Sequence, residues 1–178
     1  TGHTRCVLIR PEFMKDTFYN LTDVVKLLGA KSTAPPLGLL IVAALLPQQW
    51  ELRFIDHDVT PLTRADLEWA DIVMVGGIGP QLKPMMRIVR EAKKLGKVTV
   101  VGGSGPTLQP QLYEEADFVL KGEAEETVPE LLESLGRGAT SGRFRSQGYS
   151  DIKQSPMPRY DLVQLDAYLF IGVNYCRG

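Results

Sequence analysis

Few residues in this chain are of types that could carry out chemistry, and most of them follow short apolar segments. His57 stands between Asp56 and Asp58 in FIDHD, a grouping that can ligate a metal ion or exchange a proton. A polar residue at a strand end is the simpler interpretation, because the only other histidine is His3. The acidic segment 123–126 precedes a predicted helix, where negative charge suits the helix dipole. No Ser, Cys or Lys has a base at a recognisable spacing, so these residues predict binding and little catalysis.

Two Gly-Gly pairs are more informative. They end neighbouring apolar segments, in VGGIGPQ at 75–81 and in VGGSGPT at 101–107. Glycine leaves no Cβ in the way of a flat ligand, and the N–H groups of a following helix can hold carbonyl or phosphate oxygens. Tight strand-to-helix turns would explain a single pair equally well. Neither pair follows the first strand with the spacing G-x-G-x-x-G, and G-x-x-x-x-G-K-[ST] is absent, so neither a dinucleotide site nor a P-loop is predicted.

These loops must be positioned by alternating strands and helices. Apolar segments predict strands over 5–9, 50–58, 71–78, 97–103 and 117–123. Helices are predicted over 21–28, 35–47, 63–69, 82–95, 110–116 and 127–136. The last begins with a capping box, Thr127 to Glu130. Fully apolar strands separated by helices predict an α/β domain with a flavodoxin-like (Rossmann-like), doubly wound, five-stranded parallel sheet.

The chain changes character after this domain, which we assign to residues 1–138. Residues 139–166 are polar and rich in Gly, Ser and Pro, so they are predicted to be a linker. Residues 167–178 include the apolar run AYLFIGVNY, which predicts one more strand without a helix of its own.

Composition argues against several classes of partner. The 178 residues carry 20 basic and 21 acidic side chains without a basic run, so nucleic acid is not predicted as a partner. The longest apolar run, 37–46, is shorter than the ~20 residues that span a bilayer, so no transmembrane segment is predicted. Two cysteines and no targeting pattern predict a cytoplasmic location.

Several segments together resemble one known family. PPLGLLIVAALLP at 35–47, the Gly-Gly pair after the fourth strand and GEAEETVPELL at 122–132 resemble the cobalamin-binding domain of cobalamin-dependent radical S-adenosylmethionine (SAM) enzymes. SPMPRYDLVQLDAY at 155–168 is similar to the linker before the catalytic barrel of that family, and FIGVNYCRG at 170–178 to the first strand of the barrel. The branch that it looks most like includes hopanoid-type lipid methylases.

The resemblance implies a longer parent enzyme. In the family, the C-x-x-x-C-x-x-C motif of the barrel holds a [4Fe-4S] cluster and leaves one iron open for SAM. Cys176 is not one of these ligands, because the first of them would follow Gly178. The chain is therefore expected to end at the start of its own missing barrel, which would be its partner. The parent is expected to be a methyltransferase that acts on an unactivated carbon of a small-molecule or lipid substrate, and this chain alone is not expected to be an enzyme.

The resemblance also implies which residues contact cobalamin. The walls of the pocket are expected to be Gly76, Gly77, Ile78, Gly79, Gly102, Gly103, Ser104 and Gly105. Hydrogen bonds to the cofactor are expected from Ser104 and Thr107. The corrin amides are expected to be flanked by Gly122, Glu123 and Ala124, and the corrin or the barrel to be approached by Pro36, Leu37 and Gly38.

One departure from related cobalamin domains leaves alternatives open. Methionine synthase and the mutases carry D-x-H-x-x-G after the first strand, and its histidine ligates cobalt. The corresponding loop here, RPEFMKDTFYN at 10–20, has no histidine, so base-off cobalamin without a histidine ligand is expected. A flavodoxin-like binding module without radical chemistry, either stand-alone or degenerate, is the alternative. A flavin domain would need a Ser/Thr-rich loop there, and a response regulator would need an aspartate after the third strand, and neither is present.

Overall fold

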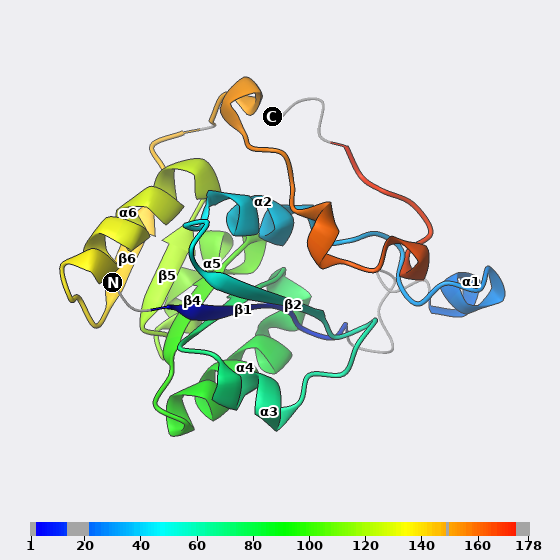
Figure 1. The fold of residues 1–178 in the computed structure, drawn as a ribbon, viewed down its shortest axis with the longest axis horizontal. Coiled ribbons are helices and arrows are strands. Elements are labelled where there is room, and N and C mark those ends of the chain that lie inside the picture. Colours follow the sequence, from blue (N-terminus) through cyan, green and yellow to red (C-terminus); the bar gives the residue numbers. More distant parts are fainter. Residues whose placement is uncertain (1–2, 14–21, 149, 174–178) are drawn as a thin grey trace.

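The computed structural model describes residues 3–13, 22–148 and 150–173, which form one parallel sheet with helices on both faces (Figure 1). The sheet has six strands in the order β2-β1-β3-β4-β5-β6, and all neighbouring pairs are parallel. The strands are β1 Arg5–Arg10, β2 Glu51–Asp56, β3 Ile72–Gly76, β4 Val98–Gly102, β5 Phe118–Lys121 and β6 Gly142–Arg145. The first five strands have the order of flavodoxin-like folds, which confirms the predicted parallel α/β class.

The sixth strand corrects the predicted count of five. β6 lies inside the segment 139–166 that the sequence predicted to be a linker. Phe144 is its one large apolar side chain and stacks on Phe118, with ring centroids 6.3 Å apart. Arg143 is exposed and donates hydrogen bonds to the main-chain oxygens of Glu114, Ala116 and Asp117. An edge strand with a single, partly buried aromatic side chain lacks the apolar run by which the other strands were predicted.

The helices cover both faces of the sheet. α2 (Leu37–Leu45) and α6 (Ala124–Gly136) lie on one face, and α3 (Arg64–Trp69) and α4 (Leu82–Lys94) lie on the other (Figure 1). Successive residues of β1 and β3 alternate between the two apolar cores that these helices cover. Burial on both faces explains why the strands are apolar at every position. Among the described residues, no helix has both the length and the apolar character needed to cross a membrane.

One helix was not predicted, and two helix predictions are wrong. The loop after β4 contains an unpredicted helix, α5 (Ser104–Leu108), and the helix predicted over 110–116 is a 3-10 turn over Pro110–Tyr113. The capping box at Thr127 is wrong, because α6 already begins at Ala124 and the Thr127 hydroxyl donates to the carbonyl oxygen of Glu123 within the first turn. The remaining predicted helices are present, and the first of them is α1 (Thr22–Leu27).

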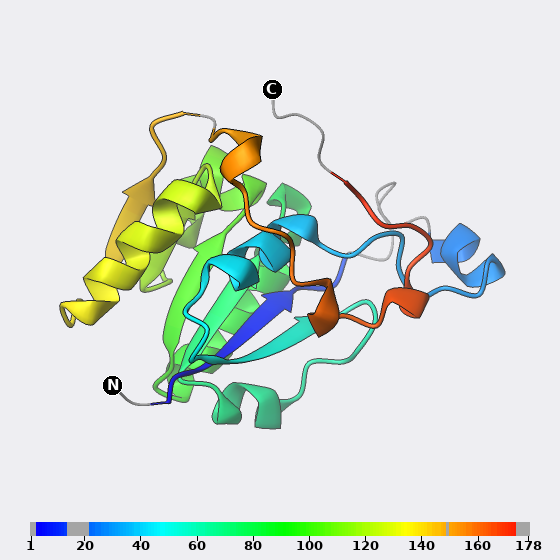
Figure 2. The same cartoon turned by 45° about the horizontal axis from the view of Figure 1, so that its top comes forward.

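Residues 150–173, which we call the C-terminal strap, return across the domain. The strap contains short 3-10 turns at Ile152–Gln154, Tyr160–Leu162 and Leu165–Ala167. Figure 2 shows it running from beside the start of α6, where Ser155 binds Glu125, past α2 toward α1. The described part of the strand predicted within 167–178 is not a strand, and its one ladder contact is an isolated parallel bridge between Ser32 and Tyr168. Residues 174–178 lie outside the described residues, so the predicted start of a barrel stays a prediction.

The packing of α4 against β4 and β5 depends on Asp117. Its carboxylate accepts hydrogen bonds from the Thr99 hydroxyl (2.7 Å), the Thr99 amide (2.9 Å) and Lys93 Nζ (2.8 Å). Burial alone would raise the pKa of Asp117, but the hydrogen bonds from Lys93 and Thr99 outweigh burial and hold this pKa below its usual value.

We therefore expect Asp117→Asn to lower the free energy of unfolding by about 1–2 kcal/mol near neutral pH. A carboxyl whose pKa is lower in the folded state stabilises the fold above its unfolded pKa, and that stabilisation is lost as the pH falls through the folded pKa. The difference from wild type should therefore begin to shrink near about pH 4, the ordinary value for a carboxyl, and disappear at lower pH. Urea denaturation at neutral and acidic pH measures both effects. Glu133→Gln, at an exposed ion pair with Arg137, is the control and should change little.

Candidate functional site

A pocket of about 450 Å³ opens at the carboxyl edge of the sheet. The strand order reverses between β1 and β3, so the connections from these strands leave toward opposite faces and a crevice forms between them. The pocket is lined from the ends of β1, β3, β4 and β5, and by the starts of α2 and α6. Most of its lining is apolar, with Leu37, Leu39, Ile41, Met74 and Val100 among the side chains.

The two Gly-Gly pairs form a glycine cradle, which comprises Gly76, Gly77, Gly102 and Gly103. Gly76 pairs with Gly102 in the β3–β4 ladder, and the Gly77 amide donates to the Gly102 carbonyl oxygen at 3.2 Å. Gly103 has φ +102°, and a Cβ there would collide with the main chain of Gly77. Only glycine fits this position, so the sequence pattern reflects a close approach of two loops.

Most of the predicted site residues line this pocket. They are Pro36, Leu37, Gly38, Gly76, Gly77, Ile78, Gly102, Gly103, Ser104, Gly122, Glu123 and Ala124. The structure thus brings together residues from four separate segments of the chain. Their contact with a cofactor stays a prediction.

Three predicted residues are outside the lining. Gly79 begins the 3-10 turn Gly79–Gln81 and is exposed. Gly105 is buried beneath the Tyr113 hydroxyl, where it allows α5 to approach the loop after β3. The Thr107 hydroxyl donates to the Gly103 carbonyl oxygen at 2.8 Å and accepts the Gly122 amide at 2.9 Å. Thr107 therefore ties two pocket loops together, and its hydroxyl proton is already used within the protein.

Several lining residues were missed from the sequence. They are Arg10, Phe13, Leu39, Ile41, Val42, Met74, Val75, Gln81, Val100, Leu120, Glu125 and Thr127. The apolar ones look like any core residue in sequence. Arg10 offered a signal, since it is a charged residue that directly follows the apolar run CVLI.

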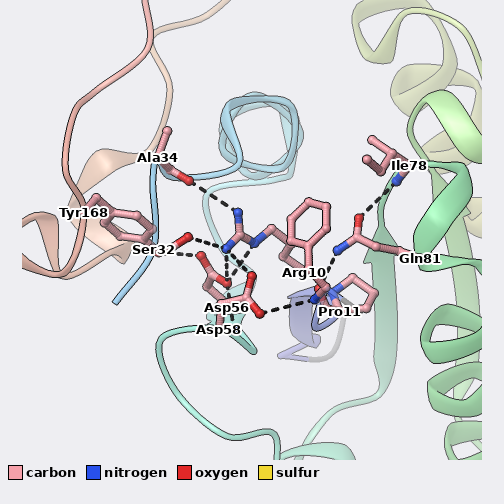
Figure 3. Close-up of polar contacts among 10 residues, drawn as sticks. Arg10, Pro11, Ser32, Ala34, Asp56, Asp58, Ile78, Gln81 and Tyr168 are labelled. Atoms are coloured by element: carbon pink, nitrogen blue, oxygen red, sulfur yellow. Dashed lines mark hydrogen bonds and ion pairs between the residues drawn. The ribbon is translucent and has the colours of Figure 1, made fainter. Parts of the chain in front are cut away.

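Gln81 joins the loops on either side of the strand-order reversal. Its side-chain oxygen accepts the Ile78 amide at 3.1 Å, and its side-chain nitrogen donates to the Pro11 carbonyl oxygen at 2.5 Å (Figure 3). The side chain is 1% exposed. A buried amide with partners on both sides fixes the loop after β1 to the loop after β3.

Arg10, which lines the pocket, is the centre of a polar cluster (Figure 3). We call it the Arg10 cluster, and it comprises Arg10, Ser32, Asp56, Asp58 and Tyr168. The guanidinium donates from Nε to Asp56 at 2.8 Å and from Nη2 to Ser32 Oγ at 2.7 Å and Asp58 at 2.9 Å. The Tyr168 hydroxyl donates to the other Asp56 oxygen at 2.8 Å.

Burial dominates the electrostatics of the Arg10 cluster. It raises the pKa of Asp56, against the lowering effect of Arg10 and of the Tyr168 hydroxyl. It also raises the pKa of Tyr168, and the Asp56 charge adds to that shift. Tyr168 therefore stays protonated as a hydrogen-bond donor at neutral pH. One guanidinium is shared between two carboxylates, so each charge depends on the others for its stability in the interior.

His57 lies beside this cluster, and it is not in the pocket lining. Its Nδ1 atom is buried and has no hydrogen-bond partner among the described residues. No group of three or more His, Cys, Asp or Glu side chains within the described part of the chain could hold a metal ion. The structure thus brings no metal-ligating group around His57 in the part of the chain that it describes.

Comparison with known proteins gives one family and three relatives. Residues 25–132, more than half of the chain, match the model of the B12 binding domain. An uncharacterized methyltransferase of Synechocystis sp. is 40% identical over 176 residues, 98% of this chain. The hopanoid C-2 methylase of Rhodopseudomonas palustris is 31% identical over 148 residues, 81% of this chain. An uncharacterized methyltransferase of Pyrococcus horikoshii is 26% identical over 171 residues.

The alignments cover 33%, 28% and 37% of these relatives, so the chain spans about a third of the length of the proteins that it matches.

Proposed function

Because the chain belongs to the B12 binding domain family, we propose that the pocket at the carboxyl edge of its sheet holds part of a cobalamin molecule. The observation that carries the proposal is the glycine cradle, where two loops approach each other so closely that only glycine fits, and where both loops line the pocket with main chain. The pocket is smaller than the whole cofactor. We therefore assign it to the nucleotide tail and its aromatic base, and the corrin to the open rim above it.

The residues present fit such a group. The glycine cradle offers main chain to one side of a planar base, and the apolar side chains of α2 and β3 exclude water from it. Ser104, whose exposed side chain follows the cradle at the start of α5, is placed to hydrogen-bond to the ligand. Neither histidine lines the pocket, which supports a cofactor without a histidine ligand on cobalt. The cofactor would be base-off because the pocket would hold its aromatic base away from the cobalt. Bound cobalamin supplies a cobalt centre that can accept and release a methyl group.

We further propose that this domain serves a cobalamin-dependent radical SAM methyltransferase. The support comes from the relatives, which are named as methyltransferases and a methylase. They are about three times longer than the region that they share with this chain. The [4Fe-4S] cluster and SAM would be bound by a barrel domain of the parent, and the substrate would be a small molecule or a lipid. The sparing use of cysteine supports a reducing, cytoplasmic location.

Titration of the chain with hydroxocobalamin, followed by its visible absorption, tests the proposal. We expect saturable binding with a base-off spectrum. In the Gly102→Val variant we expect affinity to fall about tenfold or more. The added Cβ makes only ordinary contacts, nearest to Leu120 Cβ at 3.7 Å, so the fold should tolerate it while the branched side chain narrows the pocket. A ligand forced against the added side chain would lose about 1–3 kcal/mol of binding free energy, as in an overpacked core, and about 1.4 kcal/mol corresponds to a tenfold loss of affinity.

Gly136→Ala is the control, because it adds a methyl group to open space at the far end of α6. Its affinity should equal that of wild type. Binding that survives Gly102→Val unchanged would place the cofactor elsewhere, and failure of wild type to bind would favour a domain of the family that has lost its cofactor.

A further inference from the structure

The C-terminal strap is attached to both walls of the pocket without lining it. On the α2 wall, the amide of Arg159 donates to the Leu40 carbonyl oxygen at 3.2 Å. Leu40 is fully buried and lies between two residues that line the pocket, Leu39 and Ile41. On the α6 wall, the Ser155 hydroxyl donates to Glu125 at 2.6 Å, and Glu125 lines the pocket itself.

A third attachment passes through the Arg10 cluster. The Tyr168 hydroxyl binds Asp56, and Asp56 in turn binds Arg10, which lines the pocket (Figure 3). Beside it, the strap pairs with the main chain that leads into α2. The amides of Leu169 and Phe170 donate to the carbonyl oxygen of Thr33 at 3.1 Å each. Arg10 binds the same stretch from the other side, through Ser32 Oγ and the Ala34 carbonyl oxygen.

The segment 32–34 is therefore held between Arg10 and the strap, two residues before the pocket wall begins at Pro36. Arg10, Asp56 and Tyr168 are all less than a tenth exposed, so solvent cannot replace a partner that is lost from this chain of contacts. Release of the strap would leave Asp56 without its hydroxyl donor and the segment 32–34 without its outer partner. Both changes would loosen the wall of the pocket.

We propose that Tyr168 is a positioning residue for the pocket, and that docking of the C-terminal strap and binding of the ligand stabilise each other. The proposal rests on the proposed function only for the identity of the ligand. Coupling of this kind is reciprocal: if a docked strap raises affinity by a given factor, bound ligand must favour the docked strap by the same factor. A strap that only stabilises the fold would lower the free energy of the folded protein by the same amount with and without ligand. Its loss would then leave the ligand affinity unchanged.

The test compares hydroxocobalamin affinity in wild type, Tyr168→Phe and Tyr160→Phe. Tyr168→Phe removes the hydroxyl that binds Asp56, and we expect it to weaken binding about five- to tenfold. Tyr160→Phe is a matched control, because its hydroxyl binds the Gly172 carbonyl oxygen inside the strap and makes no hydrogen bond to a pocket-lining residue in the described part of the chain. It should change affinity less than about twofold. Circular dichroism establishes that both variants are folded.

Hydrogen–deuterium exchange of the wild-type chain gives a readout that needs no variant. Amides of residues 167–170 should exchange about five- to tenfold more slowly when hydroxocobalamin is bound, and those of β6 should not change. Ligand binding with equal affinity in Tyr168→Phe, or with unchanged exchange in the strap, would overturn the coupling and leave the proposed function standing. If wild type does not bind hydroxocobalamin, the proposed function fails first and the coupling to this ligand fails with it.

Discussion

Gly103→Ala should destabilise the protein by about 3 kcal/mol or more and abolish ligand binding. Two costs add at this position. With φ +102° and ψ −174°, Gly103 occupies a region of backbone space that is closed to other residues, at about 1–3 kcal/mol. The new Cβ would also meet the main chain of Gly77, which cannot move without disturbing the β3–β4 ladder. Urea denaturation measures the first effect, and hydroxocobalamin titration of the folded fraction measures the second.

Gly138→Ala separates the two costs. Gly138 also has a positive φ, +80°, but a Cβ there would meet no neighbour within 4 Å. Backbone strain alone should cost it about 1 kcal/mol, with affinity unchanged. If both variants lost the same free energy of unfolding, the main chain of Gly77 would be able to move away from the new Cβ atom. The glycine cradle would then not be rigid.

Arg10→Met should lower the free energy of unfolding by a similar amount, because it removes a buried charge from its partners. Arg10 is 7% exposed and Asp56 3% exposed, and the variant leaves Asp56 and Asp58 without their shared cation. Removal of one partner from a buried ion pair costs about 3–5 kcal/mol, because the other charge stays buried. The double variant Arg10→Met with Asp56→Asn should be more stable than the single variant, since it removes part of the uncompensated charge. Urea denaturation of both variants measures this recovery.

The loss in Arg10→Met should also depend on pH. Without Arg10 the pKa of Asp56 rises further above its unfolded value, because burial already raises it and Arg10 is what lowers it most. A carboxyl with a raised pKa takes up its proton in the folded state as pH falls, so acid relieves the penalty. The deficit against wild type should shrink as the pH falls from neutral toward the ordinary range of a carboxyl pKa. A deficit that is constant over this range would mean that lost packing, and not charge, explains the destabilisation.

Much of the fold was predictable because burial determines which positions of each helix and strand are apolar. β1, β3 and β4 are covered on both faces, so nearly every residue in them is apolar, and α4 carries apolar residues on one side only. β6 has no such apolar run, because it is an edge strand with one large apolar side chain, Phe144. The early start of α6 was missed because Gly122, with φ +87°, ends β5 and turns the chain, which the capping pattern at Thr127 does not reveal.

The pocket was predictable where its residue types are unusual and hidden where they are ordinary. Consecutive glycines at two strand ends have few explanations, and both pairs line the pocket. Arg10 and Gln81 are common surface residues by type, and only the tertiary structure buries them. The contact between Asp56 and Tyr168 joins residues 112 positions apart, so no local pattern could have predicted it.

The two outermost strands also determine how far the sheet can extend. β2 carries Glu51 and Arg53 on its exposed side, and β6 carries Arg143 and Arg145. An open edge of unpaired main-chain groups can recruit a strand from a second molecule, and charged side chains on an edge strand oppose such pairing. The arginines of the sixth strand thus protect the sheet against edge-to-edge aggregation.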